Sequence, residues 1–400
     1  MTYPATPPKL ARYDGTGWPL FQLAFGTGLL TLMTLGIYRF WAKTRLRRYI
    51  WSSTRLDGDA FEYTGTGLEK FLGFLVAVVV LAVYLAVVQL VLFSLGLRYV
   101  MQPETQAEVL AQLALIYGSF LAVLPLLFYA SYRARRYKLA RTRFRGIRFG
   151  MEQGAGGYAW RAMLLVIVAL LSLGLLVPLA TFRLEKYLTD RTAYGDARFV
   201  QGGRWGGLYR AMIHIFIGFG ILVVAVAAAA AEAAPIAVLL GAVGYVWMIF
   251  GVVVYRVQSF AYLMRHKRLG AAIGFTADPH SGSVIGRYLL GGLLMAVILA
   301  VVGGVLAGIG LAVVGTAPLE PSAAEPPVAV LIAGAVLYLV LLVFAGALSL
   351  SLITQPILAH FTETVGVTNL QALSAIRQRS ADAGADAGGL ADALDIGGAF

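Results

Sequence analysis

Long apolar windows alternate with basic stretches along this chain. Between successive Asp, Glu, Lys and Arg residues, eight charge-free windows exceed the ~18 residues that a membrane-spanning helix needs. These windows are residues 15–38, 71–97, 109–132, 162–182, 211–231, 233–255, 288–319 and 326–362. The pattern predicts an all-α integral membrane protein with several membrane-crossing helices.

Four of the basic stretches resemble one another. They cover residues 39–67, 133–157, 183–207 and 256–286. In the closest pair, Thr54–Gly58 followed by Phe61 matches Thr142–Gly146 followed by Phe149. We interpret each stretch as a repeated unit made of a helix end with a basic stem, a short extended turn and the next helix. Gly58, Gly146, Gly195 and Gly270 are expected in the turns. The alternative is that any Arg-rich loops look alike.

The distribution of Lys and Arg predicts a topology. If all eight windows cross the membrane, each face receives 16 of these residues. If the first and fourth windows instead dip in and return, one face carries 31 and the other only Arg98. The positive-inside rule favours the second arrangement. It has six full spans, two re-entrant segments, and the basic loops and C-terminus in the cytoplasm of a bacterial inner membrane.

Helix-breaking residues lie inside both windows that we expect to be re-entrant. Gly26 and Gly28 interrupt the first window, and Gly174 and Pro178 interrupt the fourth. Re-entrant backbone is tolerated only where protein or a water-filled cavity surrounds it, so these four residues are candidates for lining a path. The alternative, in which both windows span fully, stays open.

Composition narrows the class of protein. The chain is 59% hydrophobic and 13% charged, which excludes a soluble globular domain. The net charge of +12 is explained by basic flanks of membrane helices, so no nucleic acid partner is expected. Cysteine is absent, and the four histidines share no ligand spacing. We therefore predict no metal, no cofactor and no enzymatic activity, and the charge-free windows argue against ion-coupled pumping.

The second stem is the strongest candidate for binding anionic lipid. It interleaves basic residues with aromatic ones at the expected membrane boundary, where each cation attracts anionic headgroups. The candidate headgroup ligands are Arg133, Arg135, Arg136, Lys138, Arg141, Arg143, Arg145 and Arg148. These cations could equally serve only to orient the helices.

The chain is expected to divide into three parts. Residues 1–14 would form an N-terminal cytoplasmic segment, and residues 15–362 the membrane domain with its four stem units. Residues 363–400 would form a cytoplasmic tail that is disordered from about residue 381, because large apolar residues are scarce there.

Three motifs resemble a known family. TLGIYRFWAKTRLRRYIW at Thr34–Trp51, DGDAFEYTGTG at Asp57–Gly67 and DGTG at Asp14–Gly17 are similar to those of the YjgN-like bacterial inner-membrane proteins. The resemblance is specific through about residue 160 and weaker beyond it. That family has no known function, so the resemblance implies the membrane class and no catalytic or cofactor residues.

Two functional hypotheses remain. Two broken segments inside six spans favour a channel or transporter-like protein of unknown substrate. The alternative is a membrane scaffold that binds anionic lipid or a protein partner through its basic stems. The sequence does not indicate the substrate or the oligomeric state.

Overall fold

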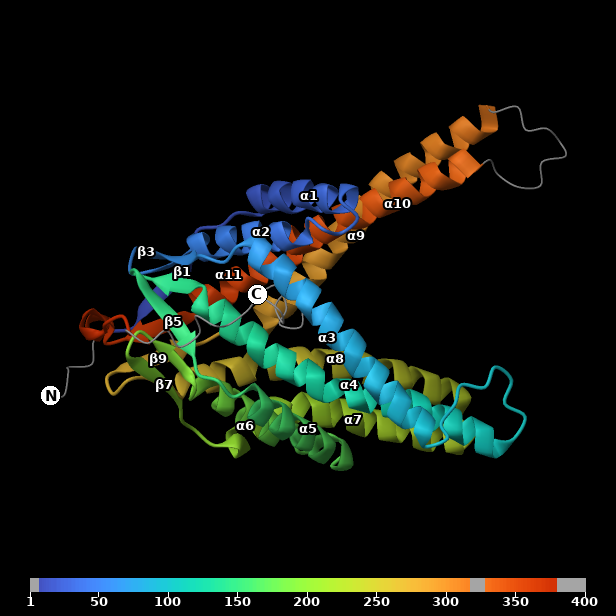
Figure 1. Ribbon diagram of the computed structural model, residues 1–400, viewed down its shortest axis with the longest axis horizontal. Coiled ribbons are helices and arrows are strands. Elements are labelled where there is room, and N and C mark those ends of the chain that lie inside the picture. Colours follow the sequence, from blue (N-terminus) through green and yellow to red (C-terminus); the bar gives the residue numbers. More distant parts are fainter. Residues whose placement is uncertain (1–6, 317–327, 380–400) are drawn as a thin grey trace.

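The computed structural model describes residues 7–316 and 328–379, in which helices alternate with short strands (Figure 1). In chain order the elements are β1 (Lys9–Tyr13), α1 (Gly17–Met33), α2 (Arg39–Ser53), β2 (Thr54–Leu56), β3 (Asp59–Tyr63), α3 (Gly67–Ser94), α4 (Gln106–Ala140), β4 (Thr142–Phe144), β5 (Ile147–Met151), α5 (Ala155–Leu171), α6 (Val177–Thr189), β6 (Thr192–Tyr194), β7 (Ala197–Gln201), η1 (Trp205–Leu208), α7 (Tyr209–Ala230), α8 (Ala234–Arg265), β8 (Lys267–Leu269), β9 (Ile273–Ala277), α9 (Ser281–Thr316), α10 (Val328–Ser349), η2 (Leu350–Thr354), α11 (Gln355–Glu363), β10 (Val365–Thr368) and η3 (Leu370–Ala375).

The strands form a closed antiparallel barrel in the order β1-β10-β9-β8-β7-β6-β5-β4-β3-β2. The prediction of an all-α protein is therefore wrong. Each strand has only three to five residues, too few for an alternating pattern to stand out from the basic stems. The barrel closes where β1 meets β10, with Lys9 opposite Val367, a contact between distant parts of the chain.

Tight turns join the paired strands within each basic stretch. The four glycines expected in these turns all have positive φ, at +89°, +75°, +55° and +58° in chain order. In the first two hairpins the residue before the glycine, Asp57 or Arg145, is also left-handed, at +53° and +48°. Two successive left-handed residues make the turn that suits the twist of a two-residue hairpin.

The first and fourth apolar windows form helical hairpins whose two ends both join the barrel. α1 and α2 connect β1 to β2, and α5 and α6 connect β5 to β6. The two reversals share one geometry, with left-handed Leu35 and Gly36 in the first and left-handed Leu173 and Gly174 in the second.

The expectation that Gly26 and Gly28 break the first window is wrong, because both lie inside α1. A Cβ on Gly28 would lie 2.5 Å from Cγ1 of Val343, so this glycine lets α1 pack closely on α10. Gly26 has no such neighbour.

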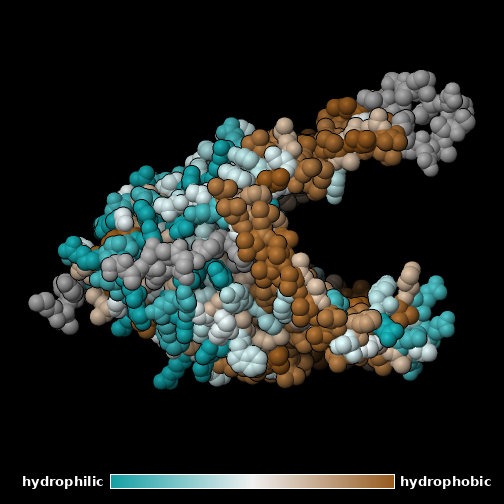
Figure 2. Space-filling view, viewed as in Figure 1, coloured by the Kyte–Doolittle hydropathy of each residue, from teal (hydrophilic) through white to brown (hydrophobic). Residues whose placement is uncertain are grey.

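Six helices in the described part of the chain are long and apolar enough to cross a membrane. They cover Gly67–Ser94, Gln106–Ala140, Trp205–Ala230, Ala234–Arg265, Ser281–Gly310 and Val328–Glu363. They extend away from the barrel in Figure 1, and Figure 2 shows hydrophobic residues over them and hydrophilic residues around the barrel. The predicted class, a polytopic helical membrane protein, is confirmed.

The largest buried cluster lies inside the barrel. Leu370 and Leu373 of η3, with Ile376, join this cluster from one end of the barrel. The segment is tied to the turn between β6 and β7, because the Asp196 amide donates to the carbonyl of Arg377 at 2.9 Å. Residues expected in two cytoplasmic tails thus include β1 and β10 of the barrel. The disorder expected from residue 381 lies outside the described residues.

Candidate functional site

The five-residue strands place their middle residue toward the barrel interior. Side chains alternate between the two faces of a strand, so the first, third and fifth residues share a face. The middle residues are Ala11, Phe61, Phe149, Phe199 and Phe275. Four of the five strands therefore contribute a phenylalanine at this level, and β1 contributes only a methyl group.

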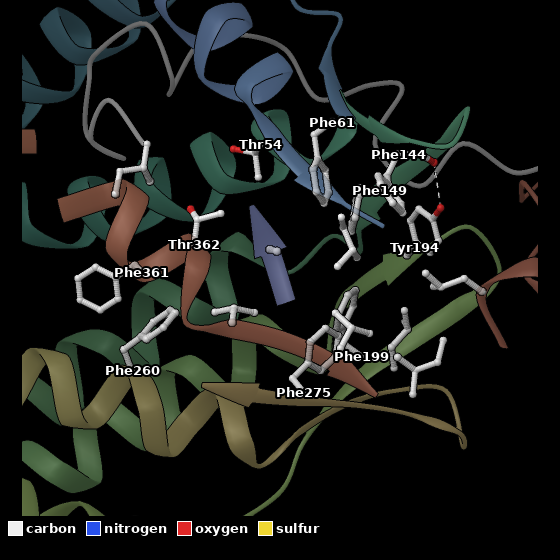
Figure 3. Close-up of a pocket in the computed structure, with 18 residues that line it drawn as sticks. Thr54, Phe61, Phe144, Phe149, Tyr194, Phe199, Phe260, Phe275, Phe361 and Thr362 are labelled. Carbon is white, nitrogen blue, oxygen red and sulfur yellow. Dashed lines mark hydrogen bonds between the residues drawn. The ribbon is translucent and has the colours of Figure 1, made fainter. Parts of the chain in front are cut away.

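The four phenylalanines form a continuous row inside the barrel (Figure 3). Ring centroids lie 6.3 Å apart for Phe61 and Phe149, 6.5 Å for Phe149 and Phe199, and 5.9 Å for Phe199 and Phe275. Tyr194 packs on this row and donates its hydroxyl proton to the carbonyl oxygen of Phe144 at 2.9 Å. Burial raises the pKa of Tyr194 to about 12, so the interior carries no charge from this group at neutral pH.

A cavity of about 440 Å³ lies among these rings. Ala11 lines it at the level where the other long strands carry phenylalanine, so the missing ring accounts for part of the space. Phe260 and Phe361 line it from the helices, and the side chains of Thr54 and Thr362 also face it (Figure 3).

A second cavity of about 400 Å³ adjoins the first, and the two share lining residues. The shared residues are Thr54, Phe61, Phe149, Leu358 and Thr362. The second cavity adds Arg135 and Lys138 of α4, together with Trp51, whose indole N–H donates to Oγ1 of Thr142 at 3.0 Å. The combined space therefore runs from an apolar chamber toward two basic side chains.

Arg135 is held in place by Glu185 of α6. Two guanidinium nitrogens of Arg135 donate to the two carboxylate oxygens of Glu185 at 3.2 and 3.3 Å. Nζ of Lys267 donates to the same carboxylate at 3.1 Å. Burial alone would raise the pKa of Glu185, but the two neighbouring cations outweigh it and lower this pKa from 4.5 to about 2. Three units of the barrel therefore meet at one ionised carboxylate.

Several cations proposed to bind lipid headgroups have partners inside the protein. Arg141 makes two hydrogen bonds to the carboxylate of Glu69, at 3.1 and 3.2 Å. Arg145 bonds the carboxylates of Asp57 and Asp59 across the adjoining hairpins. The hydrogen bonds from Lys9 and Arg145 lower the pKa of Asp57.

The remaining cations of the second stem are spread over three elements, α4, β4 and β5. Nε of Arg136 is buried and donates to the carbonyl of Met151 at 3.0 Å. Arg133 donates to the hydroxyl of Tyr129 at 3.4 Å. Arg143 and Arg148 lie opposite each other on β4 and β5. The eight cations are thus distributed over several elements, and headgroup binding by this stem stays a prediction.

The four residues expected to line a path lie in two separate hairpins. Gly26 and Gly28 belong to α1, whereas Gly174 lies in the reversal after α5 and Pro178 lies at the start of α6. Pro178 is buried, and its neighbour Leu179 lines a groove between α5 and α6.

The barrel chamber was missed by sequence reasoning, although one signal pointed to it. A phenylalanine follows each turn glycine in the repeated stretches, as Phe61 and Phe149 do in the closest pair and Phe199 and Phe275 do in the other two. That these rings converge requires the barrel, whose closure depends on strands at opposite ends of the chain. Among the described residues, no group of three or more His, Asp or Glu could hold a metal ion.

Comparisons with known proteins identify the chain's relatives. It is 26% identical over 172 residues to the inner membrane protein YjgN of Salmonella typhimurium, an alignment that covers 42% of this chain and 38% of that protein. It is 29% identical over 164 residues to YjgN of Escherichia coli O157:H7, covering 40% of this chain and 36% of that protein. The chain thus matches less than half the length of these relatives. No solved structure matches significantly.

The family match extends further than these pairwise alignments. Residues 9–271 match the family described as bacterial protein of unknown function (DUF898), a span of more than half of the chain that runs from β1 past β8. The resemblance to YjgN-like proteins noted from the motifs is confirmed, and the chain belongs to the DUF898 family of bacterial proteins of unknown function.

Proposed function

We propose that this chain is a transporter-like inner-membrane protein that binds an amphiphile, with the apolar part of the ligand inside the barrel. The observation that carries the proposal is the cavity at Ala11, in a barrel whose other long strands carry phenylalanine. A packed structural core has few voids larger than a water molecule, so a chamber of about 440 Å³ points to a ligand.

The lining indicates the chemistry of that ligand. The chamber is almost wholly aromatic and aliphatic, and each Å² of apolar ligand surface removed from water there contributes about 25 cal/mol. Arg135, which bonds Glu185, and Lys138 line the adjoining cavity, and their charges favour a negatively charged group at that end. An anionic amphiphile, such as a fatty acid or a lipid chain with its phosphate, fits both ends.

The same features argue against a channel for water or ions. Aromatic rings surround the chamber at the level of the middle residues, and Leu373 of η3 lines it as well, so apolar side chains dominate its walls. A conducting path would need polar groups or backbone carbonyls along it to replace hydration. We therefore propose exchange of an amphiphile between the chamber and the bilayer through the helix end of the barrel.

The proposal includes an orientation in the membrane. The barrel would lie on the cytoplasmic side, where the positive-inside rule puts basic loops. The hairpins α1/α2 and α5/α6 would enter the bilayer from that side and return. The left-handed reversals at Gly36 and Gly174 support this orientation, because each one turns its hairpin back so that the hairpin begins and ends at barrel strands.

Binding of a brominated fatty acid tests the chamber directly. Bromine quenches nearby indoles, and Trp51 lines the second cavity. The fluorescence of the wild-type protein should therefore fall when the ligand binds, and Trp51→Phe should remove the part of this fall that comes from Trp51. Ala11→Phe supplies the ring found at the other four strands and should abolish this quenching. Leu10→Phe is the matched control, since Leu10 is 60% exposed on the same strand, and it should bind like the wild type.

Two results would refute the chamber as the site. Equal quenching in Ala11→Phe and in the wild type would place the ligand elsewhere. If the wild type shows no quenching of Trp51, fatty acids do not bind in the chamber. Thermal unfolding of Ala11→Phe checks that the variant folds, because a ring that fills the cavity should hold or raise the melting temperature.

A scaffold that binds anionic lipid or a protein partner is the second candidate. The observation that favours it is the concentration of arginines where the helices join the barrel. The two functions differ in one readout, the movement of fluorescent fatty acid or lipid between the leaflets of proteoliposomes. Acceleration that Ala11→Phe removes supports the transporter-like protein, and bound lipid without acceleration supports the scaffold.

A further inference from the structure

A groove of about 510 Å³ lies between α5 and α6, outside the barrel chamber. Four basic side chains line it: Arg161, Arg183, Lys186 and Arg191. Asp190 is the one acid in the lining, and it pairs with Lys186 at 2.8 Å. The other three cations have no carboxylate partner among the described residues, so the groove has an unbalanced positive charge.

The groove is apolar at one end and basic at the other. Leu164, Leu165 and Leu179 line it toward the reversal at Gly174, the end farther from the barrel along both helices. Lys186 and Arg191 line it where α6 joins the barrel. An amphiphile with its anionic group toward the barrel and its chains toward the reversal matches this gradient.

Part of the basic end is held in position by Tyr187. The Arg191 guanidinium lies 3.6 Å and that of Arg161 lies 4.9 Å from the ring centroid of Tyr187. The tyrosine is fixed in turn, because its hydroxyl donates to the carbonyl of Gly154 at 2.9 Å. Two guanidinium groups on one immobilised ring lose little freedom when they bind an anion.

The residues around the groove suit a position at the membrane interface, where lipid headgroups lie. Trp160 precedes Arg161 and is 65% exposed, as expected of an aromatic side chain at a membrane interface. Arg183 is exposed and makes no hydrogen bond or ion pair with the described residues. We propose that this groove binds the phosphate headgroup of an anionic phospholipid, with Arg161, Arg183 and Arg191 as phosphate ligands and the leucines against the acyl chains.

Lipid retention by the full chain tests the proposal. Native mass spectrometry would count phosphatidylglycerol and phosphatidylcholine bound to the purified protein over a titration of each lipid. One arginine near an anionic headgroup contributes about fivefold in affinity, so Arg183→Gln should weaken phosphatidylglycerol binding about fivefold and Arg161→Gln with Arg183→Gln about 25-fold. Phosphatidylcholine binding should not change.

Two variants serve as controls. Arg256→Gln removes an exposed arginine from α8, outside the groove, and should leave phosphatidylglycerol binding within about twofold. Arg183→Lys keeps the charge and should retain most of the affinity. Because Arg183 has no bond to lose, its single variant keeps the test valid if the double variant does not fold.

Three outcomes would overturn the proposal. Unchanged phosphatidylglycerol binding in Arg183→Gln and in the double variant would remove the groove as the site. An equal loss in Arg256→Gln would show only a general effect of net charge. Displacement of phosphatidylglycerol by equimolar inorganic phosphate would show that the ligand is a free anion, since a lipid also gains from its buried acyl chains.

Discussion

The hydroxyl of Tyr262 bonds both backbone groups of Arg204: it accepts the amide proton at 3.0 Å and donates to the carbonyl oxygen at 2.9 Å. Arg204 caps the helix that follows β7, whereas Tyr262 lies on α8, just before β8. Tyr49 bonds both backbone groups of Thr16 in the same way. Single hydrogen bonds at corresponding places join Tyr187 to the carbonyl of Gly154, His360 to the amide of His280, and Tyr137 to the side chain of Glu69. A ring on each incoming helix thus holds the start of a neighbouring outgoing helix.

Removing one of these hydroxyls should loosen its junction. Tyr262→Phe loses two hydrogen bonds to the backbone at the helix start, so the free energy of unfolding should fall by about 1 kcal/mol. An SDS unfolding titration of the purified protein measures this. Tyr245→Phe is the control on the same helix, because Tyr245 is exposed and makes no hydrogen bond with the described residues. Equal losses in the two variants would contradict a role for the junction.

Glu185 should make stability depend on pH in the acid range. Its pKa is lowered in the folded protein from 4.5 to about 2 by Arg135 and Lys267. A lowered folded-state pKa adds stability that is fully present above the ordinary value and is lost as pH falls through the folded value. Wild-type melting temperature should therefore drop between about pH 5 and pH 2, whereas Glu185→Gln should show a smaller drop over that range.

The same substitution should also cost stability at pH 7. Glu185→Gln leaves two cations without their shared carboxylate, which should lower the free energy of unfolding by about 2 kcal/mol. This loss is smaller than the loss from breaking a fully buried pair, because the Glu185 side chain is 22% exposed. Glu62→Gln is the control at an exposed carboxylate and should keep the wild-type pH profile. An unchanged profile in Glu185→Gln would mean that this carboxylate does not govern acid stability.

The membrane helices could be predicted from sequence, whereas the barrel could not. Long charge-free windows are a local signal, and the left-handed turns at Gly58 and Gly146 follow from local chemistry. The strands between them have too few residues to show a period, and β1 pairs with β10 across most of the chain. For the same reason the phenylalanines were visible as a repeated residue but not as the lining of one chamber.

Arg141 and Arg143 should respond differently to loss of charge, although they are two residues apart in one stem. Arg141→Gln breaks the paired hydrogen bonds to Glu69 and should lower the free energy of unfolding by about 1 kcal/mol. Arg143 makes no hydrogen bond or ion pair with the described residues, so Arg143→Gln should change it by less than about 0.5 kcal/mol. If only Arg143→Gln lowers the retention of anionic lipid, Arg143 is the residue that contacts headgroups. If the two variants lose equal stability, the pairing of Arg141 with Glu69 does not contribute to stability.

The closed barrel also restricts the membrane topology. Arg148 lies on β5, Gly203 follows β7 and Lys267 begins β8, so all three must lie on one side of the membrane because one closed barrel contains them. Arg98 and Glu232 lie in the loops between the long helices of α3/α4 and α7/α8, at the ends away from the barrel. With the basic loops in the cytoplasm, a reporter active only in the periplasm should give signal when fused after Arg98 or Glu232 and none when fused after Arg148, Gly203 or Lys267. A cytoplasmic reporter fused at the same five positions should give the opposite pattern and controls for expression. Periplasmic signal at Gly203 alone would mean that α5 and α6 cross the bilayer as a single span. β6 and β7 would then be separated from the strands with which they pair, which would contradict the barrel itself.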